Sequence, residues 1–327
     1  MMRKHALIAG VAVVAVAAVG LRVRSQWGRK QVSILPPPAS RPAAGIPVPR
    51  DYVVDPAVVP EEAAAGPKRI ISLAPSVTEI VCALGMRDRL VGRTRHCHWP
   101  PGLEPVQTVG VVDESNYGLI KSLQPDLILL TRNSGAMLAD LTKLGLRCEA
   151  VPHEGLDEVY AAIEKIGGVC GRPQTAAALV AAMRTDIERL RGSAAKLGVP
   201  PKRVVVLFGA LPVPPQAVFV AGPGLFLSRL VELAGHRNAA RDLLKSSQGE
   251  IPLERMRVLD PDMILEFRGP SDEETMADVY QAWSQVGDLR AIRNQKVRSI
   301  GGGEWLSAGP RIAVELHRFI SVLSEPE

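Results

Sequence analysis

The chain has 327 residues, of which 46% are hydrophobic and 22% charged, and its formal net charge is +5. This length accommodates two domains that each bury their own core, and the composition excludes a disordered protein. Because much of the small positive charge lies near the N-terminus, it does not form the basic stripe of a nucleic-acid-binding domain, and we expect no nucleic-acid partner.

Residues 1–24 predict an export signal. An unbroken run of Ala, Val, Leu, Ile and Gly over residues 6–21 follows a basic start. Ala15 and Ala17 offer a small-residue cleavage site, and the run is short of the roughly 20 residues that a spanning helix needs. We expect a protein of the periplasm or of the outer face of the cytoplasmic membrane. Residues 1–24 are then either a cleaved signal peptide or an N-terminal membrane anchor.

Residues 25–67 are rich in proline, with nine prolines between Gln31 and Pro67. Such a composition favours an extended, semi-rigid linker. Further along the chain, four cysteines lack the CxxC spacing and lie in a chain too large to need disulfide staples. Buried free thiols are therefore favoured over a disulfide framework, although the spacing leaves both open, at Cys82, Cys97, Cys148 and Cys170.

The folded part begins with a short apolar run at residues 68–73, which predicts a strand, followed by helical periodicity over residues 77–84 and a stop at Gly85. The same order recurs with a strand at residues 202–207, a helix at 225–234 and a stop at Gly235. Strand, turn, helix and glycine stop form half of a βαβ unit, so the chain contains two such beginnings.

A second repeat supports this division. SLQPDLILLTR at residues 122–132 and VLDPDMILEFR at residues 258–268 lie 136 residues apart, and the two strand openings lie 134 apart. Each copy passes from a predicted helix through a Pro-Asp turn into an apolar run, which is typical of a parallel strand covered on both faces. We predict an α/β fold of two Rossmann-like lobes with parallel sheets, at residues 68–172 and 201–327.

One long helix is predicted between the lobes, within residues 173–200. It follows Pro173, runs for about 24 residues and ends near Gly198, which corresponds to roughly 36 Å at 1.5 Å per residue. A single helix is a stiff connection between the lobes, and we expect only modest lobe movement when a ligand binds.

Together these motifs resemble the vitamin B12-binding and siderophore-binding solute receptors of ATP-driven importers, whose two α/β lobes are joined by one backbone helix. The resemblance covers residues 68–323. It is carried by RIISLAPSVTE at 69–79, LVGRTRHCHWPP at 90–101, the two Leu-x-Pro-Asp motifs, VAGPGLFLSRLVELAG at 220–235 and Gly-Pro-Arg at 309–311. It implies a cobalamin-like ligand, no intrinsic cofactor, a monomer and an ABC permease as a possible partner.

Arg132 and Arg268 end the two repeated strands, one in each lobe. Ligands of open α/β sheets bind beyond the carboxyl ends of the strands, and arginine pairs well with phosphate or carboxylate. The two arginines are therefore candidates for opposite walls of a ligand cleft, or else solvated residues beyond buried strands. Asp126 and Asp262 begin the same strands, away from that cleft. Without a nucleophile elbow, an HExxH motif or a phosphate-binding lysine loop, we expect no enzyme.

Further candidates lie in three loops. The resemblance places Pro75 and Ser76 on the cleft floor, while the spacing of Ser76 to Glu79 also predicts a helix cap. His96, His98 and Trp99 are candidates for packing against a flat macrocycle, with two alternatives: metal coordination by the histidines, if the loop is extended, or an ordinary loop. Trp305 follows three glycines and is a candidate either for stacking on the ligand or for local packing.

The resemblance also implies docking on a transporter through one acidic residue in each lobe. Counting back from the repeated aspartates identifies Glu254 in the second lobe but Gly118 in the first, with Glu114 the nearest acid. The leading hypothesis is an extracytoplasmic receptor that binds cobalamin or a related metal chelate for an ABC importer. The alternatives are a tethered sensor or scavenger without a transporter, and a receptor for haem or ferric siderophores.

Overall fold

The structure is a computed structural model that describes residues 66–110, 116–209, 211, 216–268, 276–301 and 307–324. We call residues 66–169 the N-terminal half and residues 203–324 the C-terminal half. The predicted signal or anchor and nearly all of the predicted linker lie outside the described residues. No helix within the described ranges is long and apolar enough to span a membrane.

The N-terminal half is built on a parallel five-stranded sheet with the order β3-β2-β1-β4-β5. Its strands are β1 (Ile70–Ser72), β2 (Leu90–Arg93), β3 (Gln107–Thr108), β4 (Leu127–Thr131) and β5 (Cys148–Val151). Its helices are α1 (Pro75–Ala83), the 3-10 helix η1 (Arg87–Arg89), α2 (Tyr117–Ser122), α3 (Gly135–Lys143) and α4 (Leu156–Val169). The repeated strand β4 is central and buried throughout, as its apolar run predicts.

The C-terminal half is built on a sheet with the order β11-β10-β6-β7-β9, in which β8 also pairs with β6. Its strands are β6 (Arg203–Phe208), β7 (Ala217–Ala221), β8 (Arg237–Asn238), β9 (Gln248–Pro252), β10 (Met263–Arg268) and β11 (Val297–Gly301). Its helices are α6 (Phe226–Leu233), α7 (Leu253–Leu259), α8 (Met276–Ser284), α9 (Arg290–Arg293) and α10 (Ile312–Leu323). The predicted α/β class is confirmed, but this sheet is mixed, because β7 runs antiparallel to both β6 and β9.

Within each half, the Leu-x-Pro-Asp motif contacts the strand opening that was identified as the other repeat. This contact explains why the two repeats have nearly equal offsets. In the N-terminal half the carboxylate of Asp126, just before β4, accepts hydrogen bonds from the backbone N–H groups of Lys68 (2.7 Å) and Arg69 (3.0 Å), just before β1. In the C-terminal half Asp262 accepts one from the N–H of Arg203 at 2.7 Å. The Pro-Asp aspartate therefore ties the start of each repeated strand to the start of the neighbouring strand.

Side chains of successive strand residues point to opposite faces of a sheet, and in both halves both faces are covered. Leu127 and Leu129 belong to the large core cluster, whereas Ile128 and Leu130 belong to a cluster on the other face with Ile120 and Met137. The large cluster contains residues of β1, β4, α1 and α4 as well as of β6, β10, α6 and α10. One continuous apolar core thus joins the two halves.

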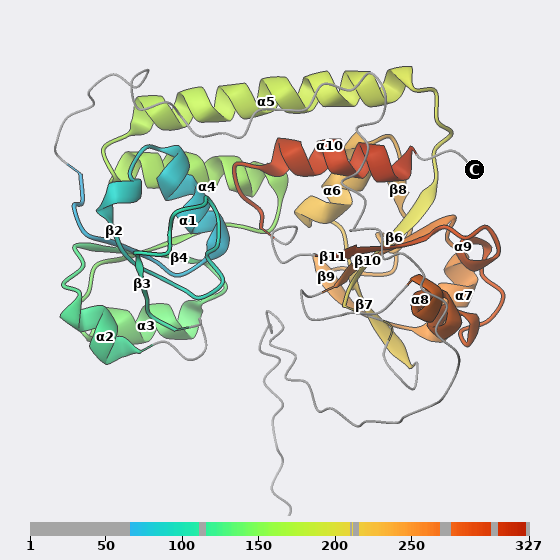
Figure 1. Cartoon of the computed structure of the whole chain (residues 1–327), viewed down its shortest axis with the longest axis horizontal. Helices are drawn as coiled ribbons and strands as arrows, with labels where there is room; N and C mark the ends of the chain where they lie inside the picture. The colour runs from blue at the N-terminus through green and yellow to red at the C-terminus, as the bar shows by residue number, and fades with distance from the viewer. Residues whose placement is uncertain are drawn as a thin grey trace, which may run out of the picture. The chain divides into compact units, whose positions relative to one another are not determined.

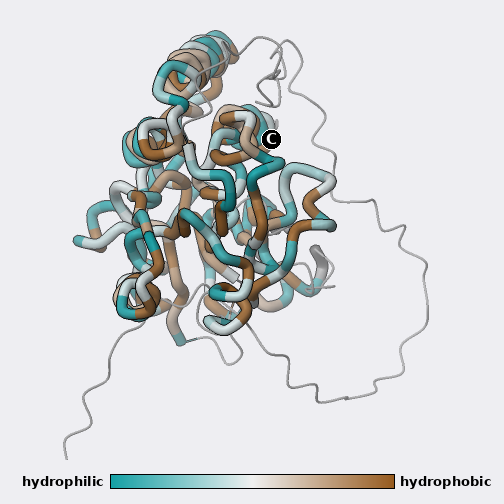
Figure 2. The backbone as a smooth tube through the Cα atoms, turned by 90° about the vertical axis from the view of Figure 1, so that its left-hand side faces the viewer, coloured by the Kyte–Doolittle hydropathy of each residue, from teal (hydrophilic) through white to brown (hydrophobic). Residues whose placement is uncertain are grey.

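Helix α5 (Pro173–Lys196) begins at the proline that the sequence indicates and has 24 residues. It packs against α4 of the N-terminal half and α10 of the C-terminal half (Figure 1). Its buried side chains, among them Leu179, Met183 and Ile187, belong to the shared core. Figure 2 shows hydrophobic segments gathered in the interior and hydrophilic ones at outer turns and helix faces. One buried face of the helix is thus packed on both halves, so the connection between them runs through the shared core.

Candidate functional site

The carboxyl ends of four neighbouring parallel strands form one edge of the N-terminal sheet. The order β2-β1-β4-β5 places the segments that follow these strands side by side. Four of the predicted positions follow β1, β2 and β4 at this edge: Pro75, Ser76, Trp99 and Arg132. The loop after β2 also carries His96 and His98. The topology thus places at one edge of the sheet the segments that carry all the ligand residues predicted in the N-terminal half.

The turn after β1 differs from the predicted helix cap. Helix α1 begins at Pro75 with Ala74 as its N-cap, and Ser76 lies inside the helix as a buried residue. The capping role of Ser76 is therefore wrong, because proline at the first helical position starts the helix earlier than the apolar periodicity indicates. The hydroxyl of Thr78 instead lies 2.7 Å from that of Ser72 and 3.1 Å from the carbonyl oxygen of Ala74, which joins the strand end to the helix.

The loop after β2 is held by Arg93. Its guanidinium donates to the carbonyl oxygens of Leu103 (3.0 Å) and Cys97 (3.1 Å), closing the loop over residues 94–103. Cys97 points inward as expected, its sulfur 3.1 Å from the Thr94 hydroxyl, and burial raises the pKa of its thiol. All four cysteines are free thiols, and all except Cys148 are buried.

His96 and His98 are both exposed, but the backbone between them is a tight turn rather than the extended segment that was expected. The N–H of His98 donates to the carbonyl oxygen of His96 at 3.1 Å. Partial burial lowers the pKa of His96, and the charges of Arg95 and His98 lower it further. Within the described ranges no group of three or more His, Cys, Asp or Glu side chains is placed to hold a metal ion.

Trp99 contacts a buried ion pair that joins the two halves. Arg311, the residue before α10, donates from its Nε to Glu79 Oε2 at 3.2 Å and from a terminal nitrogen to Glu79 Oε1 at 3.0 Å. The side chains of Glu79 and Arg311 are only 4% and 8% exposed. The central carbon of the Arg311 guanidinium lies 4.6 Å from the centroid of the Trp99 ring. Trp99 is therefore packed against a cation on one side.

The roles of Glu79 and Arg311 were missed from the sequence. Glu79 was treated only as part of a capping box, and Arg311 only as part of a family motif. A glutamate in the apolar run of α1 was the available signal, because a buried carboxylate requires a partner. That partner lies 232 residues away, so the sequence spacing did not identify it.

Arg132 follows β4 and its side chain is exposed, while its backbone N–H donates to Val151 of β5 at 2.9 Å. His153, which follows β5, shares this corner. Burial lowers the pKa of His153, the negative charges of Glu154 and Glu158 partly oppose this, and the positive charge of Arg132 adds to it. Arg132 therefore presents an exposed guanidinium that can pair with an anionic group, with the carboxylate of Glu158 nearby.

The remaining predicted residues are only partly described. Arg268 ends β10 and pairs in register with Gly301 of β11, but its side chain lies outside what the structure describes. Trp305 and Glu114 lie outside the described residues. Glu254 is exposed in the first turn of α7. Gly118 is the second residue of α2, as Glu254 is of α7, which supports the equivalence counted from the repeats.

A cavity of about 780 Å³ lies elsewhere, where the start of α4 meets α5 and α6. None of the predicted ligand residues lines it. Glu154, one of its lining residues, accepts a hydrogen bond at its carbonyl oxygen from the N–H of Phe226 at 2.7 Å. The lining residues are Glu154, Gly155, Leu156, Asp157, Glu158, Tyr160, Arg184, Ile187, Glu188, Pro223, Gly224, Ser228, Arg229, Glu232, Leu233, Arg241 and Ser247.

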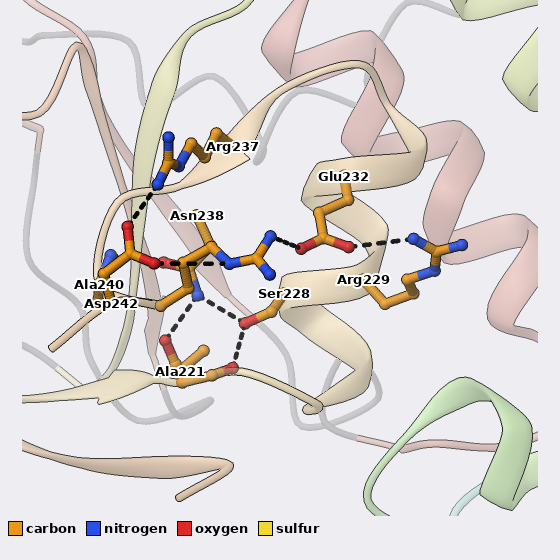
Figure 3. A network of polar contacts seen from close by, with 10 residues as sticks. Ala221, Ser228, Arg229, Glu232, Arg237, Asn238, Ala240 and Asp242 are labelled. Carbon is orange, nitrogen blue, oxygen red and sulfur yellow. Dashed lines mark hydrogen bonds and ion pairs between the residues drawn. The ribbon is translucent and has the colours of Figure 1, made fainter. Parts of the chain in front are cut away.

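Several polar groups beside this cavity are paired with one another (Figure 3). Glu232 pairs with both Arg229 and Arg241 at 3.0 Å. The Ser228 hydroxyl donates to Gly222 at 2.6 Å and accepts from the Asn238 amide at 2.6 Å. The bonds of Ser228 fix the start of α6. Because Arg229 and Arg241 are paired with Glu232, less of their positive charge is available to a ligand. The strand-end edge is therefore the stronger candidate site.

A family model described as periplasmic binding protein matches residues 70–302 of the chain. An uncharacterized ABC transporter substrate-binding lipoprotein of Bacillus subtilis, YvrC, is 28% identical over 251 residues, which cover 75% of this chain and 76% of that protein. The crystal structure of the periplasmic vitamin B12 binding protein BtuF of Vibrio cholerae matches with a TM-score of 0.64 and 26% identity, covering 79% of this chain and 96% of that chain.

A periplasmic heme binding protein from Pseudomonas aeruginosa also matches, with a TM-score of 0.65 and 25% identity over 76% of this chain and 90% of that chain. The family and these similar proteins are binding proteins, which confirms the expectation of a non-enzymatic protein.

Proposed function

Because the chain belongs to the periplasmic binding protein family, we propose that it binds cobalamin or a related metal chelate and delivers it to an ABC importer. The observation that carries the proposal is the edge of the N-terminal sheet, where the loop with Trp99, the turn at Pro75 and exposed Arg132 lie side by side. The likeness to the Vibrio cholerae vitamin B12 binding protein supports this ligand class.

The chemistry of the edge fits such a ligand. A flat macrocycle with an anionic group needs an aromatic or apolar surface together with a cation. Trp99 and Pro75 offer the first, and Arg132 offers the second. In the C-terminal half Arg268 is the last residue of β10, and Trp305 comes four residues after the end of β11 in the sequence. We propose these two residues for the opposite wall of a cleft between two lobes, residues 68–172 and 201–327.

Titration of the full chain, purified in mild detergent, tests this proposal. Cyanocobalamin, haemin and a ferric siderophore are added in turn and binding is followed by absorbance and calorimetry. Arg132→Ala should weaken binding of the anionic ligand about fivefold to tenfold at low salt and less at high salt, because salt screens exposed charges. Combination with Arg268→Ala should weaken it further.

Arg147→Ala is the matched control, because Arg147 is an exposed arginine just before β5, at the opposite edge of the sheet. Equal losses in Arg132→Ala and Arg147→Ala would mean that net charge, not the site, governs binding. If none of the three ligands binds, the proposed ligand class is wrong.

A haem or ferric-siderophore receptor is the second candidate, favoured by the two exposed imidazoles of His96 and His98 beside Trp99. Imidazole nitrogen is a common iron ligand. The absorption spectrum of the haemin complex should change in the double variant His96→Ala with His98→Ala if either histidine coordinates iron. An unchanged spectrum excludes coordination and leaves packing against the ligand as their role.

A tethered sensor or scavenger is the third candidate, favoured by Gly118 at the place that Glu254 occupies in the C-terminal half. If the protein feeds an importer through two acidic residues, with Glu114 substituting for the missing one, Glu254→Ala and Glu114→Ala should each reduce ligand uptake by cells without changing ligand affinity. Gly118→Glu should then increase uptake. Uptake that is unaffected by all three variants favours the sensor or scavenger.

For location, we propose an extracytoplasmic protein, exported by residues 1–24. The mass of the protein recovered from cells decides between a cleaved signal peptide and a retained anchor, since cleavage removes the N-terminal residues. Resistance to carbonate extraction would support the anchor. Light scattering of the purified protein tests the expected monomer.

A further inference from the structure

The Glu79–Arg311 pair not only neutralises two buried charges but also fixes the orientation of the Arg311 guanidinium. Two nitrogen–oxygen contacts, of 3.2 Å and 3.0 Å, hold the planar guanidinium in line with the carboxylate. A fork held at two points has one orientation, unlike a lysine ammonium, which is a point charge. The plane of Arg311 is therefore set by Glu79 on α1.

The Arg311 guanidinium contacts Trp99 of the candidate ligand loop. The Trp99 ring lies against Arg311, with 4.6 Å from the guanidinium carbon to the ring centroid, within the range of a cation–π contact. Trp99 is part of the loop that follows β2, whereas Arg311 directly precedes α10. One side of the ring is thus held by a residue of the C-terminal half, which limits the orientations that the other side presents.

The surroundings of the pair leave it little freedom to move. A Cβ atom at Gly309 would lie 2.8 Å from Glu79 Oε2, so the backbone before α10 passes directly over the carboxylate. Ile312 and Ala313, which follow Arg311, are part of the shared core. Val77 and Ile80, which flank Glu79, are part of it as well. The pair is therefore anchored on both sides by packed helices.

We propose that Glu79 and Arg311 are positioning residues for the ligand: they orient Trp99 and hold the start of α10 against α1, so that the ligand meets a preset aromatic surface. This inference rests on the proposed ligand site at the edge of the N-terminal sheet. It predicts that ligand affinity depends on the guanidinium plane of Arg311, even though Arg311 is nearly buried and Trp99 is the residue that meets the ligand.

The first experiment needs no ligand. The full chain is labelled with 5-fluorotryptophan, and the fluorine resonance of Trp99 is assigned by its loss in Trp99→Phe. Arg311→Lys keeps the charge but removes the planar fork, so the Trp99 resonance should shift or broaden. The resonance of Trp283, which is fully buried and donates to Glu266, should stay unchanged. Arg189→Lys, in an exposed ion pair with Asp186, is the matched control.

The second experiment separates positioning from stability, with cyanocobalamin and haemin as the probes. The double variant Glu79→Leu with Arg311→Met replaces the pair by apolar side chains of similar size, which often preserves stability. We expect it to keep its thermal midpoint but to bind the probe about tenfold more weakly, because the Trp99 ring has lost its support. Unchanged affinity in a stable double variant would overturn the proposal.

A double-mutant cycle covers the case in which that variant does not fold. Trp99→Leu and Arg311→Lys are measured singly and together in binding of the same probe. If Arg311 acts through Trp99, Arg311→Lys has no further effect once Trp99 is replaced. Independent, additive losses would contradict the proposal. If the wild-type chain binds neither probe, the proposed function fails at that point, while the fluorine spectra still decide whether Arg311 orients Trp99.

Discussion

Replacing Asp126 tests the physical explanation of the sequence repeat. Asp126→Ala removes a carboxylate that accepts two backbone hydrogen bonds, at 2.7 Å and 3.0 Å, from the segment that opens β1. Hydrogen bonds to a charged group contribute roughly 1.5–3 kcal/mol each when shielded. These two are exposed, so we assign about 1 kcal/mol to each and expect a loss of about 2 kcal/mol.

The loss is measured by urea unfolding followed by circular dichroism and by the thermal midpoint. Since 1 kcal/mol shifts the midpoint of a domain of this size by about 2–4 °C, we expect a decrease of about 4–8 °C. Asp126→Asn keeps one acceptor oxygen and should lose about half as much free energy. The slope of the urea transition should not change, because neither variant alters the surface that unfolding exposes.

Asp140→Ala is the control, because it removes only an exposed carboxylate paired with Lys143 at 3.1 Å. Such pairs contribute at most about 1 kcal/mol. If Asp126→Ala costs no more than Asp140→Ala, the repeated aspartate does not hold the two strands together, and the near-equal offsets of the repeats need another explanation. Asp262→Ala should show a loss of similar size, because it removes both the hydrogen bond from the Arg203 N–H and the ion pair with Arg290 at 2.5 Å.

Two further predictions concern stability. His236 accepts a hydrogen bond from the N–H of Lys202 at 3.1 Å, and burial, with the charge of Lys202 adding to it, lowers its pKa from 6.5 to about 4. As the pH decreases, the His236 imidazole is protonated in the unfolded chain before it is protonated in the folded one. The free energy of unfolding should therefore fall by up to about 3 kcal/mol between pH 6.5 and about 4. Urea unfolding of His236→Asn across this pH range should show a flatter profile. Gly309→Ala should destabilise the protein by about 1–3 kcal/mol because its methyl group would crowd the Glu79 carboxylate. Gly192→Ala, on α5 with open space around it, should stabilise by up to about 1 kcal/mol; similar thermal midpoints for these two glycine variants would contradict the crowding.

Much of the fold was predictable because its signals are local. The apolar run of β4 indicates a strand buried on both faces, and Pro173 and Gly198 bracket α5 within two residues. Gly85 and Gly235, which were predicted to stop two helices, adopt φ angles of 72° and 89°, a left-handed conformation that glycine reaches without strain. The antiparallel β7 was not predicted, because an isolated apolar strand carries no information on the direction of its neighbour.

The candidate site was predictable in part for a similar reason. The order of strands and turns indicates which residues follow a strand, and this was enough to select Arg132, whereas Pro75 and Trp99 were selected through the family resemblance. Their side-chain environments depend on contacts that local patterns do not encode. The contact of Trp99 with Arg311 is such a case, whereas the helix start at Pro75 carries a local signal, proline at the first helical position, that the apolar periodicity outweighed in the prediction.

The sequence by itself determined where the repeated strands and the long helix form, because backbone conformation and burial there follow from residue type and spacing over a few positions. It also determined that two similar units exist, because a repeat with preserved spacing reflects one structural plan used twice. Only the tertiary structure decided that Glu79 meets Arg311 and that Arg311 lies on Trp99. A buried charge must find a partner, but which partner it finds depends on how two sheets and the helices around α5 pack together.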